Sequence, residues 1–360
     1  MYESCILARN HGAICPFMKN GSYFNPLLEL GPDPWALWDR HTYFYTHTLQ
    51  DRIDLWQTPD LTSLKSAIRK TIWLPDQPQY AKHIWAPEIH RIQGKWYVYF
   101  TADDGDTDNH QIYVLENEND DPMQGSFILK GRVSTDPENN WAIDASVFAN
   151  AGALYMVWSG WQSRRKHEET QCIYIAKMET PWKLGSERVL ISKPTFAWER
   201  KWETPPEHGR SPRYPIFVNE GPQPLKSPDG SLIHIAYSAS GCWTPHYALG
   251  LLTCSHDTDP LQPENWRKSA QPVFRQSAEA GVYGTGHCSF FPSPDGTESY
   301  ILYHARDMQY EPGLPNETID HRSPRMQAFH WSDDGYPDFG TPFATSTPLP
   351  KPFTLNVVNT

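Results

Sequence analysis

Residues 94–102 read GKWYVYFTA, a short run that opens with a glycine and is rich in aromatic residues. Alternating runs of β-branched and aromatic residues opened by a turn residue are typical of β-strands. This stretch therefore predicts a strand, and four further stretches of the chain resemble it.

The related stretches are HTYFYTHT (41–48), GALYMVWSG (152–160), GSLIHIAYS (230–238) and ESYILYHA (298–305). We expect each of the five to be the first strand of a unit. A second strand follows each after a short break, at 52–58, 110–118, 171–179, 247–255 and 325–333. Successive units begin 53 to 78 residues apart, which leaves room for four strands in each. Radial repetition of small antiparallel sheets predicts an all-β, five-bladed β-propeller.

The chain is predicted to form a single domain over residues 1–360, since no linker-like composition interrupts it. Its 33 prolines and 22 glycines favour frequent turns over long helices. Only residues 61–70 (LTSLKSAIRK) suggest a helical turn or two. Because a propeller must be closed as a ring, we expect residues 1–30 and 340–360 to be the closing segments.

Charge and hydropathy exclude several partners. The formal net charge is −11, which disfavours nucleic acid because that affinity rests on clustered Lys and Arg. No run of about 20 apolar residues is present, so no membrane span is predicted. Residues 1–20 show no apolar signal-peptide core, and the sequence leaves the compartment open. The six cysteines form no CxxC pair and no zinc-like spacing with histidine.

Three acidic residues hold similar places in three of the units. Asp33, Asp144 and Glu220 each follow a short apolar or turn-like lead-in and precede a small residue or a proline. Each lies eight to ten residues before one of the aromatic strands. Equivalent positions in different blades converge on the axis of a propeller, so we expect these three carboxylates to share one pocket.

Clustered carboxylates have two chemical uses. Glycoside hydrolysis needs one protonated acid at the leaving oxygen and one ionised carboxylate on the other side of the sugar. A third anion nearby raises the pKa of the acid. The alternative is a divalent-cation site, since grouped carboxylates also bind calcium.

Aromatic residues near the same junctions favour a sugar ligand, because flat rings pack on the apolar faces of sugars. Trp85, in the stretch HIWAPE, is the predicted platform, and Trp161 is a further candidate. His287, in GTGHC, holds the matching place in the fifth unit, where a core histidine is the alternative. Arg322 has the planar fork that binds a carboxylate or sugar hydroxyls.

Together these stretches resemble glycoside hydrolase family 43. The matching motifs are Asp33-Pro34, Trp85-Ala86-Pro87-Glu88, Ile143-Asp144 with Phe148, Glu220-Gly221-Pro222, Gly284-Thr285-Gly286-His287, and Arg322 ahead of Trp331 to Pro337. They occur in the family's order and cover roughly residues 25–340. The resemblance implies a five-bladed propeller that hydrolyses glycosides with inversion.

By that resemblance, Asp33 is the general base, Glu220 the general acid and Asp144 the residue that modulates the pKa of Glu220. Arg322 is implied to contact the sugar. His287 is implied to lie near a channel cation, often calcium, in some members. Cys288 stands where many relatives have Asn, which puts that metal site in doubt. No cofactor is expected to be required.

The resemblance also implies an arabinose- or xylose-containing oligosaccharide or polysaccharide as substrate. The Glu-Gly-Pro form and the Trp-rich loops favour an exo-acting α-L-arabinofuranosidase on arabinan or arabinoxylan side chains. A β-xylosidase or an endo-arabinanase is the alternative within the family. A non-catalytic sugar-binding propeller is the alternative from another class, because it too would keep the aromatic residues.

Overall fold

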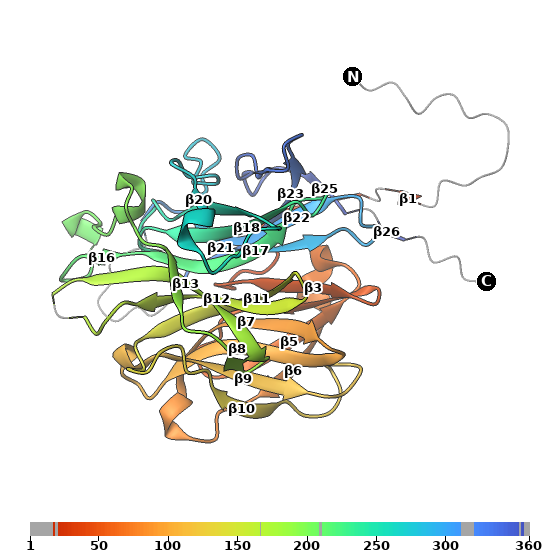
Figure 1. Ribbon diagram of the computed structural model, residues 1–360. Coiled ribbons are helices and arrows are strands. Elements are labelled where there is room, and N and C mark those ends of the chain that lie inside the picture. Colours follow the sequence, from red (N-terminus) through yellow and green to blue (C-terminus); the bar gives the residue numbers. More distant parts are fainter. Residues whose placement is uncertain are drawn as a thin grey trace, which may run out of the picture.

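Five antiparallel sheets surround a central axis in the computed structural model, which describes residues 17–18, 21–165, 167–208, 211–310, 320–352 and 354–355 (Figure 1). The first strands of the five sheets contact one another in the order β3, β7, β11, β17, β21 and back to β3. This closed circuit makes the molecule one five-bladed propeller, as the repeated strand pairs predict.

Each blade runs outward from the axis in chain order. Blade 1 contains β3 (Trp35–Asp39), β4 (Thr42–Thr46), β5 (Ile53–Thr58) and β6 (Ile68–Trp73). Blade 2 contains β7 (Lys82–Ile92), β8 (Lys95–Asp103), β9 (Gln111–Asn117) and β10 (Ile128–Arg132). Blade 3 contains β11 (Ala142–Asn150), β12 (Ala153–Trp161) and β13 (Glu169–Thr180), with β14 (Lys183–Leu184), β15 (Val189–Ser192) and β16 (Ile216–Phe217) all pairing with β13.

Blades 4 and 5 repeat the plan. Blade 4 contains β17 (Asn219–Lys226), β18 (Leu232–Ala239), β19 (Ala248–Ser255) and β20 (Arg267–Lys268). Blade 5 contains β21 (Tyr283–Pro292), β22 (Ser299–Arg306), β23 (Ser323–Trp331) and β24 (Pro337–Asp338). The helical turn expected at 61–70 is a 3-10 helix, η1 (Leu61–Ser66), begun by Asp60, whose carboxylate accepts the Thr62 N–H at 2.8 Å.

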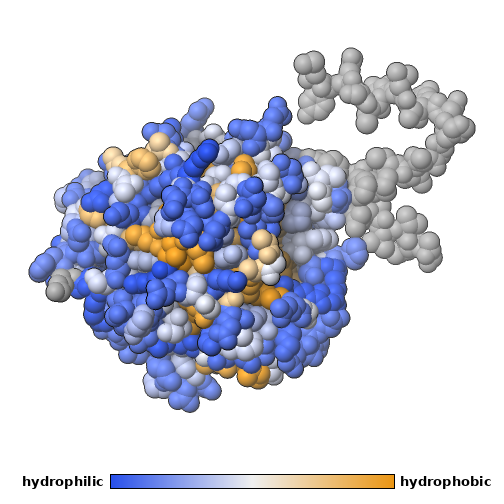
Figure 2. Space-filling model, in the orientation of Figure 1, coloured by the Kyte–Doolittle hydropathy of each residue, from blue (hydrophilic) through white to orange (hydrophobic). Residues whose placement is uncertain are grey.

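Strand β8 shows why such sequences fold this way. Its side chains alternate between two neighbours: Trp96, Val98 and Phe100 pack against blade 1, whereas Tyr97 and Tyr99 pack against blade 3. A separate apolar cluster of this kind lies at each of the five blade interfaces. Truncating one such side chain, as in Trp96→Ala, is expected to cost about 3–5 kcal/mol. Much of the visible surface is hydrophilic, and apolar residues show mainly in a band across its middle (Figure 2).

The structure corrects the predicted strand order. The aromatic runs at 41–48, 94–102, 152–160, 230–238 and 298–305 are the second strands of their blades (β4, β8, β12, β18 and β22), and an innermost strand precedes each. Asp144 and Glu220, expected at junctions between loop and strand, therefore lie inside β11 and β17. These inner strands escaped prediction because prolines, glycines and changes of register break their alternation.

Segments near the two ends of the chain meet beside blade 5. Strand β2 (Ser22–Tyr23) pairs with β25 (Leu349–Pro350), and β1 (Phe17–Met18) pairs with β26 (Thr354–Leu355). The Asn25 side chain both donates to the Met326 carbonyl and accepts the Met326 N–H, at 2.9 and 3.0 Å. Residues 1–16 and 356–360 lie outside the described residues, and the ring-closing role of 1–30 and 340–360 stays a prediction. No described helix has the length and apolar character needed to cross a membrane.

Candidate active site

In each blade, a residue with left-handed backbone lies in the first half of the innermost strand or just before it. These residues are Asp33 (φ 56), Ala86 (φ 44), Asp144 (φ 57), Gly221 (φ 53) and His287 (φ 46). In β7, β11, β17 and β21 the register shifts at the same place. Bulges of this kind re-aim side chains, and strained backbone gathers at functional sites.

A hydrogen bond to a neighbouring blade stabilises each of these bulges. In every case the backbone N–H of the left-handed residue donates to a side chain of the preceding blade. The pairs are Ala86 to Thr48 Oγ1 (2.7 Å), Asp144 to Thr101 Oγ1 (3.3 Å), Gly221 to Asp144 Oδ2 (3.0 Å), His287 to Ser238 Oγ (2.7 Å) and Asp33 to His304 Nδ1 (3.1 Å). This repeated contact fixes the directions in which the acidic side chains leave the backbone.

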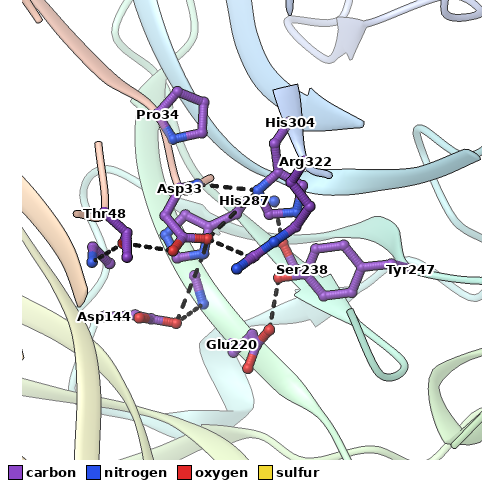
Figure 3. A network of polar contacts seen from close by, with 12 residues as sticks. Asp33, Pro34, Thr48, Asp144, Glu220, Ser238, Tyr247, His287, His304 and Arg322 are labelled. Carbon is purple, nitrogen blue, oxygen red and sulfur yellow. Dashed lines mark hydrogen bonds and ion pairs between the residues drawn. The ribbon is translucent and has the colours of Figure 1, made fainter. Parts of the chain in front are cut away.

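The result is a cavity of about 180 Å³ at the axis. Its lining residues are Asp33, Gln50, Trp85, Ile143, Asp144, Glu220, Cys242, His287 and Arg322. Six of the seven predicted site residues are therefore brought together, and Trp161 is not among them. The labelled acids, His287 and Arg322 point toward one another (Figure 3). The cavity is smaller than the roughly 300–1,000 Å³ typical for drug-sized ligands, so it suits one small unit.

Asp33 is held as an ionised carboxylate. Its Oδ1 lies 2.8 Å from Arg322 Nη1, and its Oδ2 accepts a hydrogen bond from the Thr48 hydroxyl at 2.7 Å. Burial alone would raise its pKa, but Arg322 and the neighbouring histidines outweigh burial and hold the pKa well below 3.8. An ionised carboxylate is the form that a general base requires.

Asp144 and Glu220 behave in the opposite way. Burial, followed by the charges of Glu220 and Asp33, raises the pKa of Asp144 well above 3.8. Burial also raises the pKa of Glu220 to about 7, although a hydrogen bond from Tyr247 at 2.7 Å lowers it in part. The pair can therefore carry a proton near neutral pH while Asp33 carries none, and such a split separates acid from base.

Arg322 owes its position to a second carboxylate. Its Nε lies 2.8 Å from Asp320 Oδ1, and its Nη2 lies 2.5 Å from Asp320 Oδ2. This two-point contact fixes the plane of the guanidinium. Nη1 is then directed at Asp33, so that one cation serves both carboxylates.

His287 lies between two of the acids. Its Nδ1 is 3.3 Å from Asp33 Oδ1 and 4.0 Å from Asp144 Oδ2. Burial lowers its pKa, which favours the neutral ring. No group of three His, Cys, Asp or Glu side chains in the described part of the chain has the arrangement of a metal site. The adjacent Cys288 is buried, and burial raises the pKa of its thiol; a calcium ion near His287 stays a prediction.

The two predicted tryptophans differ in position. The Trp85 indole N–H donates to Gln50 Oε1 at 2.7 Å, and its ring lies 4.0 Å from that of His110, so it is fixed at the cavity wall. Trp161 is buried and stacks on Trp141 with ring centroids 5.0 Å apart. Trp161 therefore supports the wall from behind, in a small apolar cluster with Trp141 and Ile143.

Several residues around the cavity escaped prediction. Gln50 reaches it through a left-handed backbone (φ 72) that a two-way backbone pairing with Ile84 maintains. Tyr247 lies in a run that looks like an ordinary strand, and Thr48, Ser238 and His304 lie at or near the ends of such runs. Nothing local in the sequence separates these residues from structural ones, because their partners lie on other strands, and most of them on other blades.

Larger hollows lie elsewhere in the described part of the chain. One of about 850 Å³ is lined by residues of the second and third blades, including Trp182. Tyr97 stacks on that indole, and the Lys130 ammonium lies over it at 4.4 Å. Another of about 680 Å³ lies around Trp38 and the paired Asp39 and Arg91. The lining of the first hollow has four acidic residues, but it also has three basic ones, Arg132, Lys183 and Arg188.

Comparison with known proteins agrees with this geometry. The sequence model of the family described as glycosyl hydrolases family 43 matches residues 23–337. An extracellular exo-α-(1→5)-L-arabinofuranosidase from Streptomyces avermitilis is 36% identical over 341 residues, which cover 92% of this chain and 66% of that protein. A protein of the same name from Streptomyces chartreusis is 36% identical over 300 residues, covering 81% of this chain and 85% of that protein.

A solved structure gives the same picture. The crystal structure of an α-L-arabinofuranosidase from Lactobacillus brevis superposes with a TM-score of 0.80 at 33% identity, covering 90% of this chain and 98% of that one. The present chain spans slightly less than two thirds of the length of the Streptomyces avermitilis relative.

Proposed function

This chain belongs to glycosyl hydrolases family 43, and from that premise we propose that it is an inverting, exo-acting α-L-arabinofuranosidase. The observation that carries the proposal is the split between the acids of one cavity. Arg322 holds Asp33 ionised, whereas burial keeps a proton available to Glu220 near pH 7. Inverting hydrolysis needs one carboxyl group in each of these states.

The proposed mechanism assigns each group one task. Asp33 accepts a proton from water as that water attacks the anomeric carbon. Glu220 donates its proton to the glycosidic oxygen, so that the leaving alcohol departs neutral. Asp144 accepts the Gly221 N–H at 3.0 Å and thereby positions the backbone beside Glu220. Because two neighbouring carboxylates repel each other, the Asp144–Glu220 pair resists losing both of its protons.

The remaining wall residues would bind the sugar. Trp85 offers the indole that packs against an apolar sugar face, and Arg322 offers donors to hydroxyl groups. Arabinofuranosidase names among the relatives support the choice of sugar. The small cavity supports the exo action, because it suits a terminal unit better than the middle of a polymer.

Hydrolysis of model substrates tests the proposal. The purified protein is supplied with aryl α-L-arabinofuranoside, aryl β-D-xyloside and linear arabinan, with Glu220→Ala as the control. We expect arabinose release from the arabinofuranoside and from chain ends, with little turnover by the variant. Proton NMR during the reaction should show the β-anomer as the first product, since inversion of an α-glycoside gives it.

Other outcomes would replace the proposal with a named alternative. Preferential cleavage of the xyloside would indicate a β-xylosidase, and rapid shortening of arabinan into oligosaccharides would indicate an endo-arabinanase. Sugar binding without release from any substrate would indicate a non-catalytic propeller.

A further inference from the structure

A chain of hydrogen bonds with a fixed direction ends on Glu220. It begins at the His287 backbone N–H, which donates to Ser238 Oγ at 2.7 Å. A backbone N–H can only donate, so the Ser238 hydroxyl accepts there and has its single proton left to direct at the hydroxyl of Tyr247, whose pKa it lowers. Tyr247 in turn donates its only hydroxyl proton to Glu220 Oε1 at 2.7 Å.

The ring of Tyr247 is as constrained as its hydroxyl. The side chain is fully buried and stacks on His304 with centroids 5.5 Å apart and an interplanar angle of 6°. Gly286 lies against its edge, where an added Cβ would come within 2.2 Å of Cε1. The glycine before His287 in the Gly-x-Gly-His motif thus makes room for Tyr247.

The same contacts connect the predicted acid to the predicted base. His304, on which Tyr247 stacks, accepts the backbone N–H of Asp33 through Nδ1 at 3.1 Å. Two parallel, stacked rings therefore connect Glu220 to Asp33, one hydrogen-bonded to each residue. A displacement of Tyr247 would alter the spacing of both groups.

We propose that Tyr247 is a positioning residue, which holds Glu220 through Oε1 so that Oε2 is the oxygen left to give its proton to the leaving group. This inference rests on the proposed function, since it takes Glu220 as the general acid. Tyr247 does not touch the reacting atoms and acts only through Glu220.

Loss of this hydrogen bond has a predictable direction. A donor to a carboxylate stabilises its ionised form, and the Tyr247 contact lowers the pKa of Glu220 from the level set by burial. The other charges that act on Glu220 are those of Asp33, Arg322 and Glu169, and Asp144, His287 and Cys242 share its cavity. None of these groups changes in Tyr247→Phe, so the pKa of Glu220 should rise.

The test is Tyr247→Phe, because it removes one oxygen and keeps the ring against His304 and Gly286. The matched control is Tyr97→Phe, which deletes another tyrosine–glutamate hydrogen bond of 2.7 Å, to Glu116 in blade 2. For both variants kcat/KM is measured against pH on 4-nitrophenyl α-L-arabinofuranoside and on α-1,5-arabinobiose. Melting temperatures are recorded in parallel.

For Tyr247→Phe we expect the basic limb of the profile to move up by about one pH unit, the size that one hydrogen bond to a charged group supplies. We also expect kcat on arabinobiose to fall about tenfold, part of what a general acid contributes, with a smaller loss on the nitrophenyl substrate. Ser238→Ala should move the limb the same way by less, because it weakens the Tyr247 donor without removing it. Tyr97→Phe should leave the limb unmoved.

A basic limb that stays in place in Tyr247→Phe, or moves down, would overturn the proposal. Equal losses on the two substrates would do the same, because they would show no specific effect on proton donation. The position of a limb does not depend on how much enzyme is folded, so partial instability leaves this readout intact. If Glu220→Gln itself kept full activity on arabinobiose, the acid assignment would fail first, and the two failures are thereby told apart.

Discussion

Arg322 and Asp33 are 289 positions apart in the chain, yet Nη1 of the first lies 2.8 Å from Oδ1 of the second. The contact joins blade 5 to blade 1, where the ring closes. It places a permanent cation beside one of three clustered carboxylates and thereby distinguishes that carboxylate from the other two. The predictions below depend on this asymmetry.

Asp33→Asn should reduce turnover by several orders of magnitude, even on activated aryl arabinofuranosides, because an amide cannot accept the proton of the attacking water. Steady-state kinetics on 4-nitrophenyl α-L-arabinofuranoside measure the loss. Asp54→Asn is the control, since Asp54 is also buried and lies 2.7 Å from an arginine, Arg69, away from the cavity. Wild-type rates in Asp33→Asn would remove Asp33 from the mechanism.

Glu220→Gln should lose far more activity on substrates with poor leaving groups than on those with good ones. The amide keeps the shape of the side chain but has no acidic proton, and a nitrophenolate departs without one. The expected loss on arabinobiose is about 10²–10⁴-fold, the usual contribution of a general acid. Calorimetry should show that arabinose still binds. A uniform loss on all substrates would contradict the assigned role.

The pH dependence of kcat/KM should form a bell with unequal limbs. Activity needs ionised Asp33 and protonated Glu220. The acidic limb should therefore lie below pH 3.8, because Arg322 and the nearby histidines lower the pKa of Asp33 against the effect of burial. The basic limb should lie near pH 7, where burial places the pKa of Glu220. A basic limb below pH 5 would show that Glu220 is not the group that must hold the proton.

Stability should reveal the same raised pKa. A group whose pKa is higher in the folded state than in the unfolded state stabilises the fold. This contribution is complete below the unfolded-state pKa, and it is lost as the pH rises through the folded-state pKa. For Glu220 the loss takes place between pH 4.5 and about pH 7, and it lowers the free energy of unfolding by up to about 3 kcal/mol. Glutamine does not titrate, so Glu220→Gln should melt above the wild type at pH 8, with the difference shrinking toward pH 4.5.

Glu116→Gln gives a control of opposite sign for the melting experiment. Burial acts to raise the pKa of Glu116, but Tyr97 and Lys130 outweigh it and lower the pKa in the folded protein. Removing this favourable charge should lower the melting temperature at pH 8. Two variants that shifted the same way would show that the effect is not tied to the carboxyl pKa.

The two tryptophans should separate in kinetics. Trp85→Ala should raise KM for arabinofuranosides with a smaller change in kcat, because the indole would bind substrate without taking part in proton transfer. Trp161→Ala should instead lower the melting temperature by emptying a buried site behind the wall, at a cost of about 3–5 kcal/mol. A larger KM effect from Trp161 than from Trp85 would reverse this assignment.

Local pattern and motif order made much of this site predictable. Asp33, Asp144 and Glu220 have similar flanking residues, and the aromatic strands recur at steady spacing, so convergence on one axis followed from the chain alone. Trp85 and His287 were predicted from their places in the blade units and Arg322 from its planar fork, and all three also lie in motifs shared with a known family. Trp161 was expected at the cavity, but the structure places it behind the cavity wall. A position near a junction does not determine the direction in which a buried ring points.

The amino-acid sequence by itself determined the fold class, the number of blades and the three acids, since each depends on residues close together in the chain. Only the tertiary structure decided which strand is innermost, because that depends on which strand meets the other blades. It also decided which acid is ionised. That choice depends on Arg322 and on hydroxyl groups such as Thr48 and Tyr247, whose hydrogen bonds form between segments far apart in sequence and within one buried cavity.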